Sequence, residues 1–161
     1  MNSTIDYEKL KLFYIGKEEL AKDVYAPLVY KNKDLLTHAA IIGMTGSGKT
    51  GLGISLLEEA AIDNIPSIII DPKGDMGNLL LTFPNLQGSD FEPWIEEQDA
   101  INNGVTLKEH AQNTANLWKK GIEGDFQNIQ RIEKLKNAAD FTIYTPGSNA
   151  GVQISILSSF K

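Results

Sequence analysis

The residues best suited to chemistry lie in one glycine-rich segment, Gly43-Met44-Thr45-Gly46-Ser47-Gly48-Lys49-Thr50. The segment fits the pattern G-x-x-x-x-G-K-[ST], whose backbone N–H groups surround phosphate oxygens. Glycine permits positive φ and a close approach to an oxygen, so that successive N–H groups can converge on one phosphate. The pattern therefore predicts a nucleotide-binding loop. Its predicted binding residues are Gly43, Met44, Thr45, Gly46, Ser47, Gly48, Lys49, Thr50 and Gly51.

Two side chains of this segment have separate predicted roles. Lys49 supplies a full positive charge to the β- and γ-phosphates and is the first catalytic candidate. The Thr50 hydroxyl can ligate a Mg²⁺ ion that bridges those phosphates. ATP and Mg²⁺ are thus the expected cofactors. The alternative is a plain glycine turn beside an exposed lysine.

A second group of candidates follows about twenty residues later. Three isoleucines precede Asp71, which places its carboxylate at the carboxyl end of an expected strand, where open α/β sheets bind ligands. Asp71 is either an outer-sphere Mg²⁺ ligand or water organiser, or a structural cap of the turn that follows. Asp75 adds a second carboxylate, which is either catalytic or an ordinary turn residue.

The expected elements position these groups in a βαβ unit. Short apolar runs over 38–42 and 67–71 are typical of strands buried on both faces of a parallel sheet. Between them, apolar residues recur at steps of three and four through Asp63, which predicts an amphipathic helix closed by Asn64 and Pro66. The two strands should be parallel, with a right-handed crossover.

The remaining segments define the expected organisation. Residues 1–36 should hold one strand, Leu10–Ile15, and a polar connector, and residues 37–161 should form a partial ATPase core. That core should carry a helical insertion at about 76–140. The insertion should contain a helix from near Pro93 to Asn103 and a helix begun by a Thr106/Glu109 capping box. Gly121 and Gly124 should break that second helix, and a last helix should form a hairpin with it. Segments 141–145 and 152–156 have strand composition.

Composition excludes several classes of function. The chain has 161 residues, a net charge of −6 and no cysteine, so disulfide scaffolds, thiolate nucleophiles and Cys-ligated metal sites are ruled out. Only His38 and His110 are available for a histidine metal centre. The first residues lack the order of a signal peptide, and no apolar run approaches the roughly 20 residues of a membrane span. We therefore expect a cytoplasmic protein without a membrane partner.

Nucleic-acid binding does not follow from the charge, because the balance is acidic and Arg131 is the only arginine. The densest basic region is interleaved with acidic residues, so we interpret it as a solvated helical face, with a DNA-contacting patch as the alternative. Its basic residues are Lys119, Lys120, Arg131, Lys134 and Lys136. Trp94 and Trp118 are interpreted as core or partner surface, with base stacking as the alternative.

The segment Thr37–Thr50, together with Ile70-Asp71-Pro72-Lys73-Gly74-Asp75, resembles the HerA/FtsK superfamily of ATP-driven DNA translocases and helicase-like proteins. The resemblance extends over most of the chain from about Phe13. It implies an α/β fold of the RecA-like, additional-strand P-loop class, with a parallel sheet flanked by helices and a helical insertion, assembled as a homo-hexameric ring around duplex DNA.

The same resemblance implies two further catalytic groups. Its catalytic glutamate and arginine finger lie downstream of the Asp-Pro-x-Gly segment, and neither has a counterpart here, so we expect a truncated core. The predicted function is the ATP·Mg-binding core of a motor ATPase that acts on DNA. A nucleotide-gated scaffold and a non-motor P-loop kinase or GTPase are the alternatives.

Overall fold

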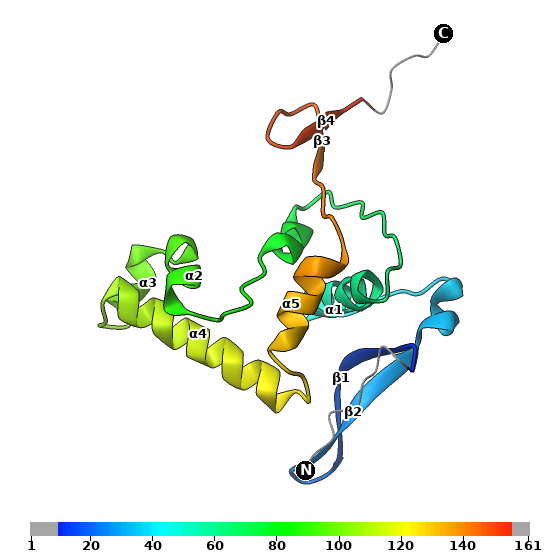
Figure 1. The fold of residues 1–161 in the computed structure, drawn as a ribbon, viewed down its shortest axis with the longest axis horizontal. Coiled ribbons are helices and arrows are strands. Elements are labelled where there is room, and N and C mark those ends of the chain that lie inside the picture. Colours follow the sequence, from blue (N-terminus) through cyan, green and yellow to red (C-terminus); the bar gives the residue numbers. More distant parts are fainter. Residues whose placement is uncertain (1–9, 156–161) are drawn as a thin grey trace.

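A computed structural model describes residues 10–155 of the chain. Within that range the protein is a mixed α/β structure with two separate two-stranded sheets, β1–β2 and β3–β4, and five α-helices (Figure 1). The helix α1 (Lys49–Ile62) lies near the centre, and the helices α2 (Gly88–Phe91), α3 (Glu97–Asn102) and α4 (Leu107–Gly124) lie to one side of it.

The N-terminal sheet is an antiparallel hairpin of β1 (Leu12–Ala21) and β2 (Val24–Lys31). A tight turn joins the strands, with Asp23 at φ 62°, a conformation that aspartate tolerates better than most residues. The expectation of a polar connector after Gly16 is therefore wrong, because this segment pairs back onto β1. Pro27 obscured the second strand, yet it is compatible with a two-stranded sheet, in which each strand has an unpaired edge. A 3₁₀ helix, η1 (Asn32–Leu36), follows.

The helix α1 confirms the predicted helix and its end, but not a purely apolar buried face, because Leu52 is exposed and Glu59 is buried. Asn64 adopts φ 57°, the Asn64 N–H donates to the Ala61 carbonyl at 3.0 Å, and the Ile65 N–H donates to the Ala60 carbonyl at 2.8 Å. This pair of bonds is the Schellman motif that closes many helices.

The two apolar segments around α1 differ from the expectation. Residues 38–44 and 65–71 have no strand assignment, and Ile42, Ile68 and Ile70 are each at least 90% exposed. A strand exists only where a neighbour completes its hydrogen-bond ladder, and neither segment belongs to a ladder of the described residues. The predicted buried parallel sheet is thus not seen, and the mixed α/β class is what the structure shows.

The region after α1 is mostly helical, as predicted, but its divisions differ. A 3₁₀ helix, η2 (Asp75–Leu80), precedes α2, and the expected helix from Pro93 is split into η3 (Glu92–Trp94) and α3. The predicted capping box at the start of α4 is confirmed, since the Glu109 N–H donates to Thr106 Oγ1 at 3.3 Å and the Thr106 N–H to Glu109 Oε2 at 2.9 Å. Of the two glycines expected to break this helix, Gly121 lies within α4 and Gly124 is its last residue.

A small hydrophobic core forms where α2 packs against α4. Leu86 and Phe91 pack on Ala111 and Ala115, whose side chains are fully buried. The two helix backbones approach closely, because a Cβ on Gly88 would lie 3.1 Å from the Gln112 Cα.

The last helix, α5 (Gln130–Ala138), lies beside α1 (Figure 1). The expected hairpin with α4 is therefore wrong: a turn at Asp125–Phe126 redirects the chain, and α5 packs on α1. Arg131 of α5 forms an ion pair with Glu59 of α1, and both side chains are largely buried. This contact ties the helical region to the helix that follows the glycine loop.

The C-terminal sheet pairs β3 (Tyr144–Pro146) with β4 (Val152–Ile154) in parallel. The predicted strand over 141–145 is thus shifted toward Pro146. The expectation of a further extended piece is met by β4, while Ile156 and the apolar segment that follows it lie outside the described residues.

Candidate nucleotide-binding loop

The backbone of the glycine-rich loop turns at two glycines with positive φ. Gly46 and Gly48 adopt φ 80° and 85°, which a side chain would strain. The Ser47 N–H donates to the Met44 carbonyl at 3.2 Å, so the loop folds back on itself. A Cβ on Gly43 would collide with the Ser47 hydroxyl and lie 3.3 Å from the Ser47 Cβ. The spacing of the glycines therefore matches the positions where the chain turns most tightly.

The loop leads directly into the N-terminus of α1. Gly48 is the N-cap residue of α1 and has no side chain that could accept a capping hydrogen bond. The first helical bond joins the Leu52 N–H to the Gly48 carbonyl at 2.9 Å. The N–H groups of Lys49, Thr50 and Gly51 consequently have no acceptor within the helix. Together with the helix dipole, they provide donors and positive potential for an anion.

Lys49 is held over its own loop. Its Nζ donates to the Met44 carbonyl at 2.6 Å, and the side chains of Lys49 and Thr50 are partly exposed. The ammonium group therefore lies on the loop whose N–H groups it would assist. These backbone donors, one ammonium group and one hydroxyl are the group types that a triphosphate with its Mg²⁺ ion requires.

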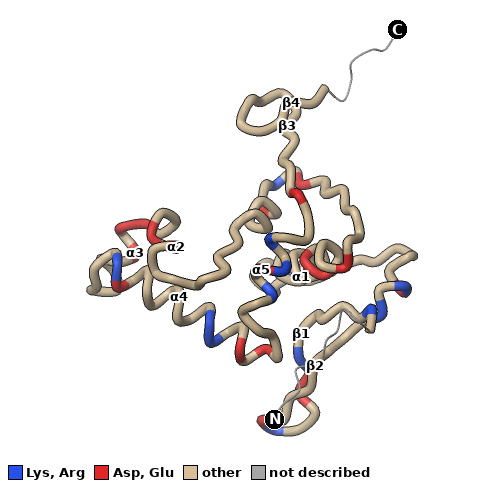
Figure 2. The backbone as a smooth tube through the Cα atoms, viewed as in Figure 1, with Lys and Arg blue, Asp and Glu red and all other residues tan. Residues whose placement is uncertain are grey.

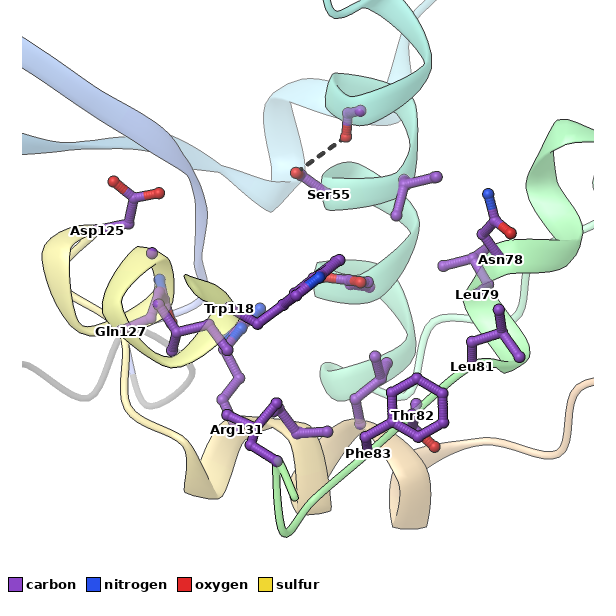
Figure 3. Close-up of a pocket in the computed structure, with 18 of the residues that line it drawn as sticks. Ser55, Asn78, Leu79, Leu81, Thr82, Phe83, Trp118, Asp125, Gln127 and Arg131 are labelled. Atoms are coloured by element: carbon purple, nitrogen blue, oxygen red, sulfur yellow. Dashed lines mark hydrogen bonds between the residues drawn. The ribbon is translucent and has the colours of Figure 1, made fainter. Parts of the chain in front are cut away.

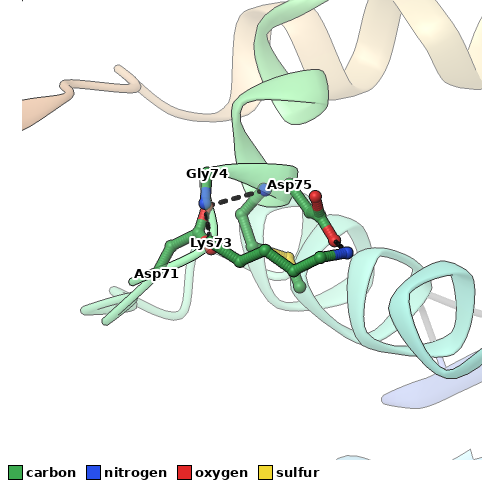
Figure 4. A network of polar contacts seen from close by, with 5 residues as sticks. Asp71, Lys73, Gly74 and Asp75 are labelled. Carbon is green, nitrogen blue, oxygen red and sulfur yellow. Dashed lines mark hydrogen bonds and ion pairs between the residues drawn. The ribbon is translucent and has the colours of Figure 1, made fainter.

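Asp71 organises the turn that follows the second apolar segment (Figure 4). Its Oδ1 accepts the Gly74 N–H at 2.9 Å and its Oδ2 accepts the Met76 N–H at 2.8 Å. These two bonds hold the pKa of Asp71 below its ordinary value, and the bond from Met76 has the largest effect. The geometry is that of a turn cap, one of the two alternatives for this residue.

The neighbouring charges of this turn are paired with each other. Asp75 forms an ion pair with Lys73, and that hydrogen bond raises the pKa of Lys73. Met76 lies against α1, since a Cβ on Gly53 would be 3.7 Å from its Cε. The Asp71 turn and the loop over 43–51 are therefore both connected to the first turns of α1.

Sequence reasoning assigned no role to Glu59, although the structure makes it a central contact. Glu59 is 2% exposed and binds Arg131, which is 72 positions away in sequence. A possible signal was a carboxylate among Leu56, Leu57 and Ala60 in a chain with a single arginine. Buried charges need partners, so the arginine was the strongest candidate.

Acidic and basic residues are both spread along the described chain (Figure 2), and the segment 90–99 holds acidic residues without a basic one. Lys119, Lys120, Lys134 and Lys136 are exposed, in agreement with a solvated helical face, whereas Arg131 is turned toward α1. No cluster of three or more His, Cys, Asp or Glu side chains suited to a metal ion occurs among residues 10–155. Within the same residues, no helix is both long and apolar enough to cross a membrane.

Comparison with known proteins places the chain in a family. Residues 13–158 match the family described as "Helicase HerA, central domain", and the chain therefore belongs to this family of HerA/FtsK-type P-loop ATPases. The expected resemblance is confirmed.

One curated relative shares part of the chain. The type 4 coupling protein DotL of Legionella pneumophila is 46% identical over 48 residues, which are 30% of this chain. The matched segment covers 6% of the length of that protein. No solved structure matches the chain.

Proposed function

We propose that residues 43–51 bind the phosphates of ATP with Mg²⁺, and that the chain is the nucleotide-binding core of a motor ATPase coupling ATP hydrolysis to DNA translocation or processing. The observation that supports this most is the glycine loop at the start of α1, with its positive-φ glycines and uncapped helix N-terminus. Membership in the HerA central-domain family supports the motor class.

The proposal gives each residue one task. The N–H groups of the loop and of the first turn of α1 bind the phosphate oxygens, and Lys49 balances the charge on the β- and γ-phosphates. Thr50 would ligate Mg²⁺, and Asp71 would order a water of its coordination shell. Bound Mg²⁺ would neutralise charge on the phosphates and the leaving group. Asp75 is a weaker catalytic candidate, because its carboxylate already pairs with Lys73.

The organisation proposed for the chain is an N-terminal unit over 1–36 and a core over 37–161 with a helical insertion at about 76–140. In the assembled protein we propose a homo-hexamer around DNA, by family resemblance. No residue of this chain is proposed as the water-activating glutamate or as the arginine finger. Arg131 does not serve as a finger in this arrangement, because its guanidinium binds Glu59.

Calorimetry with Mg·ATP tests the binding step. Lys49→Ala should weaken binding at least about tenfold, because a charge-assisted contact to the phosphates is lost. Lys119→Ala, which removes an exposed lysine on α4, is the matched control and should bind as the parent chain does. Equal binding by the parent chain and Lys49→Ala, or no heat with Mg·ATP, would refute the proposal.

Phosphate release separates the motor from its alternatives. ATP turnover stimulated by duplex DNA supports a motor, and nucleotide binding without turnover supports a scaffold or a core that needs further residues. A preference for GTP, or rapid transfer of phosphate to a small acceptor, would contradict the motor proposal.

A further inference from the structure

A cavity of about 850 Å³ lies between α1, η2 and the helices α2, α4 and α5 (Figure 3). This volume is in the range of small-molecule sites, roughly 300–1,000 Å³. The cavity borders the proposed phosphate site at Gly51, which is its one lining residue from the segment 43–51.

Aromatic side chains form much of the cavity wall. Both tryptophans of the chain, Trp94 and Trp118, line it together with Phe83 and Phe91. The Phe91 ring centroid lies 6.4 Å from that of Trp118 and 4.8 Å from that of Phe83. Trp94 and Trp118 are still 62% and 58% exposed. Their exposed surfaces offer apolar contact and an electron-rich face that attracts cations.

The charged groups of the wall are mainly acidic. Three carboxylates and one guanidinium line the cavity, and two of the carboxylates already have partners, since Glu59 pairs with Arg131 and Asp125 pairs with Lys17 at 2.6 Å. Glu58 forms no ion pair with any residue of the described range. Burial raises the pKa of Glu58, and the nearby charge of Arg131 opposes that shift. A cation placed beside Glu58 would relieve this cost.

One further polar group at the wall lacks a partner. Gln127 Nε2 is buried and has no hydrogen-bond acceptor among the described residues. Such a donor costs free energy until an acceptor reaches it. Gln127 and Trp118 both point toward the space between α4, α5 and α1 (Figure 3).

From these walls we propose that the cavity is a second ligand site, which takes a small aromatic molecule bearing a protonated amine and an oxygen acceptor. The ring packs against Trp118 and Phe83, the ammonium lies beside Glu58, and the oxygen accepts from Gln127. The three contacts use no residue assigned to ATP, although Gly51 borders both sites, so the two proposals can be tested separately.

Two matched probes test the site: tyramine, and tyrosol, in which a neutral hydroxyl replaces the amine. The two indole N–H resonances report binding directly, because Trp94 and Trp118 are the only tryptophans. At neutral pH tyramine should shift both resonances and bind about tenfold more tightly than tyrosol, because only tyramine carries the charge.

Variants assign the recognition to named groups. Glu58→Gln keeps the size of the side chain and should remove the preference for tyramine, whereas Glu97→Gln, at an exposed position on α3, should retain it. Trp118→Leu should weaken binding of both probes. Lys49→Ala should leave tyramine binding unchanged, which separates this site from the ATP site.

Three results would overturn the proposal. Equal affinity for tyramine and tyrosol would show that the site does not recognise the ammonium charge. Unchanged tyramine binding in a folded Glu58→Gln variant would show that Glu58 is not the group that binds it. Probe binding without a shift of either indole resonance would place the ligand elsewhere.

Discussion

The Asp71 side chain is the clearest example of a residue that can serve two roles. Its two oxygens accept the N–H groups of Gly74 and Met76 and so hold the turn. A carboxylate has about four lone-pair sites, so these two bonds leave room for an ordered water on each oxygen. The cap seen in the structure is therefore compatible with the proposed water-mediated contact to Mg²⁺.

The pKa of Asp71 gives a pH prediction. Because its folded pKa lies below its ordinary value of 3.8, the carboxylate stabilises the turn above that value and loses this effect as the pH falls through the folded pKa. Amide hydrogen exchange at Gly74 and Met76 should accordingly accelerate in acid, measured relative to amides in the core of α4.

Asp71→Ala removes the acceptors at every pH. In this variant the Gly74 and Met76 amides should exchange faster at neutral pH and lose the acid-dependent change. Asp34→Ala, at an exposed position on η1, should leave both amides unaffected. Exchange rates that are the same with and without the Asp71 carboxylate would contradict the capping role.

At the scale of elements, the start of α4 shows how far local sequence specifies structure. Thr106 and Glu109 predicted a capping box, and both bonds are present. Thr106→Ala should reduce the free energy of unfolding by about 1 kcal/mol, because the Thr106 side chain satisfies an N–H of the first turn. Urea denaturation measures this loss, and Thr142→Ala, at an exposed position outside any helix, serves as its control. An unchanged midpoint would contradict the cap.

The Glu59–Arg131 pair makes a stronger prediction about α1 and α5. Arg131→Met should cost about 3–5 kcal/mol of unfolding free energy, because Glu59 would remain buried without its cation. The double variant Arg131→Met/Glu59→Leu should regain much of the lost unfolding free energy, because an apolar pair can be buried without desolvating a charge.

Denaturation of the two single variants and the double variant measures the coupling. Lys136→Met is the control, because it removes an exposed cation from the same helix. Additive losses in the double variant would show that the two side chains do not depend on each other.

At the scale of the whole molecule, prediction succeeded where the signals were local. The end of α1 at Asn64 and the start of α4 at Thr106 each depend on a few adjacent residues. The sheet partners depend on non-local pairing, which short sequence patterns do not specify. The hairpin strand β2 was missed for this reason, and the expected partners over 38–42 and 67–71 are not paired. The proposed phosphate-loop residues, by contrast, come from one contiguous motif and stay a prediction.

The exposed second apolar segment provides a test at this scale. Ile68 is 97% exposed, so Ile68→Ala should change the unfolding free energy by less than about 0.5 kcal/mol. In a buried parallel strand the same change would cost about 2–5 kcal/mol. Leu135→Ala, at a buried position of α5, should cost an amount in the larger range and is the positive control. A large loss for Ile68→Ala would support the sheet expected from sequence.

The burial of Arg131 also offers a way to measure how often the contact between α5 and α1 opens. Since this residue carries the chain's sole guanidinium and packs against α1, an arginine-specific dicarbonyl reagent has a single target. The rate at which Arg131 is labelled would follow how often α5 separates from α1. Mass spectrometry with and without Mg·ATP would then measure whether the proposed ligand changes that separation.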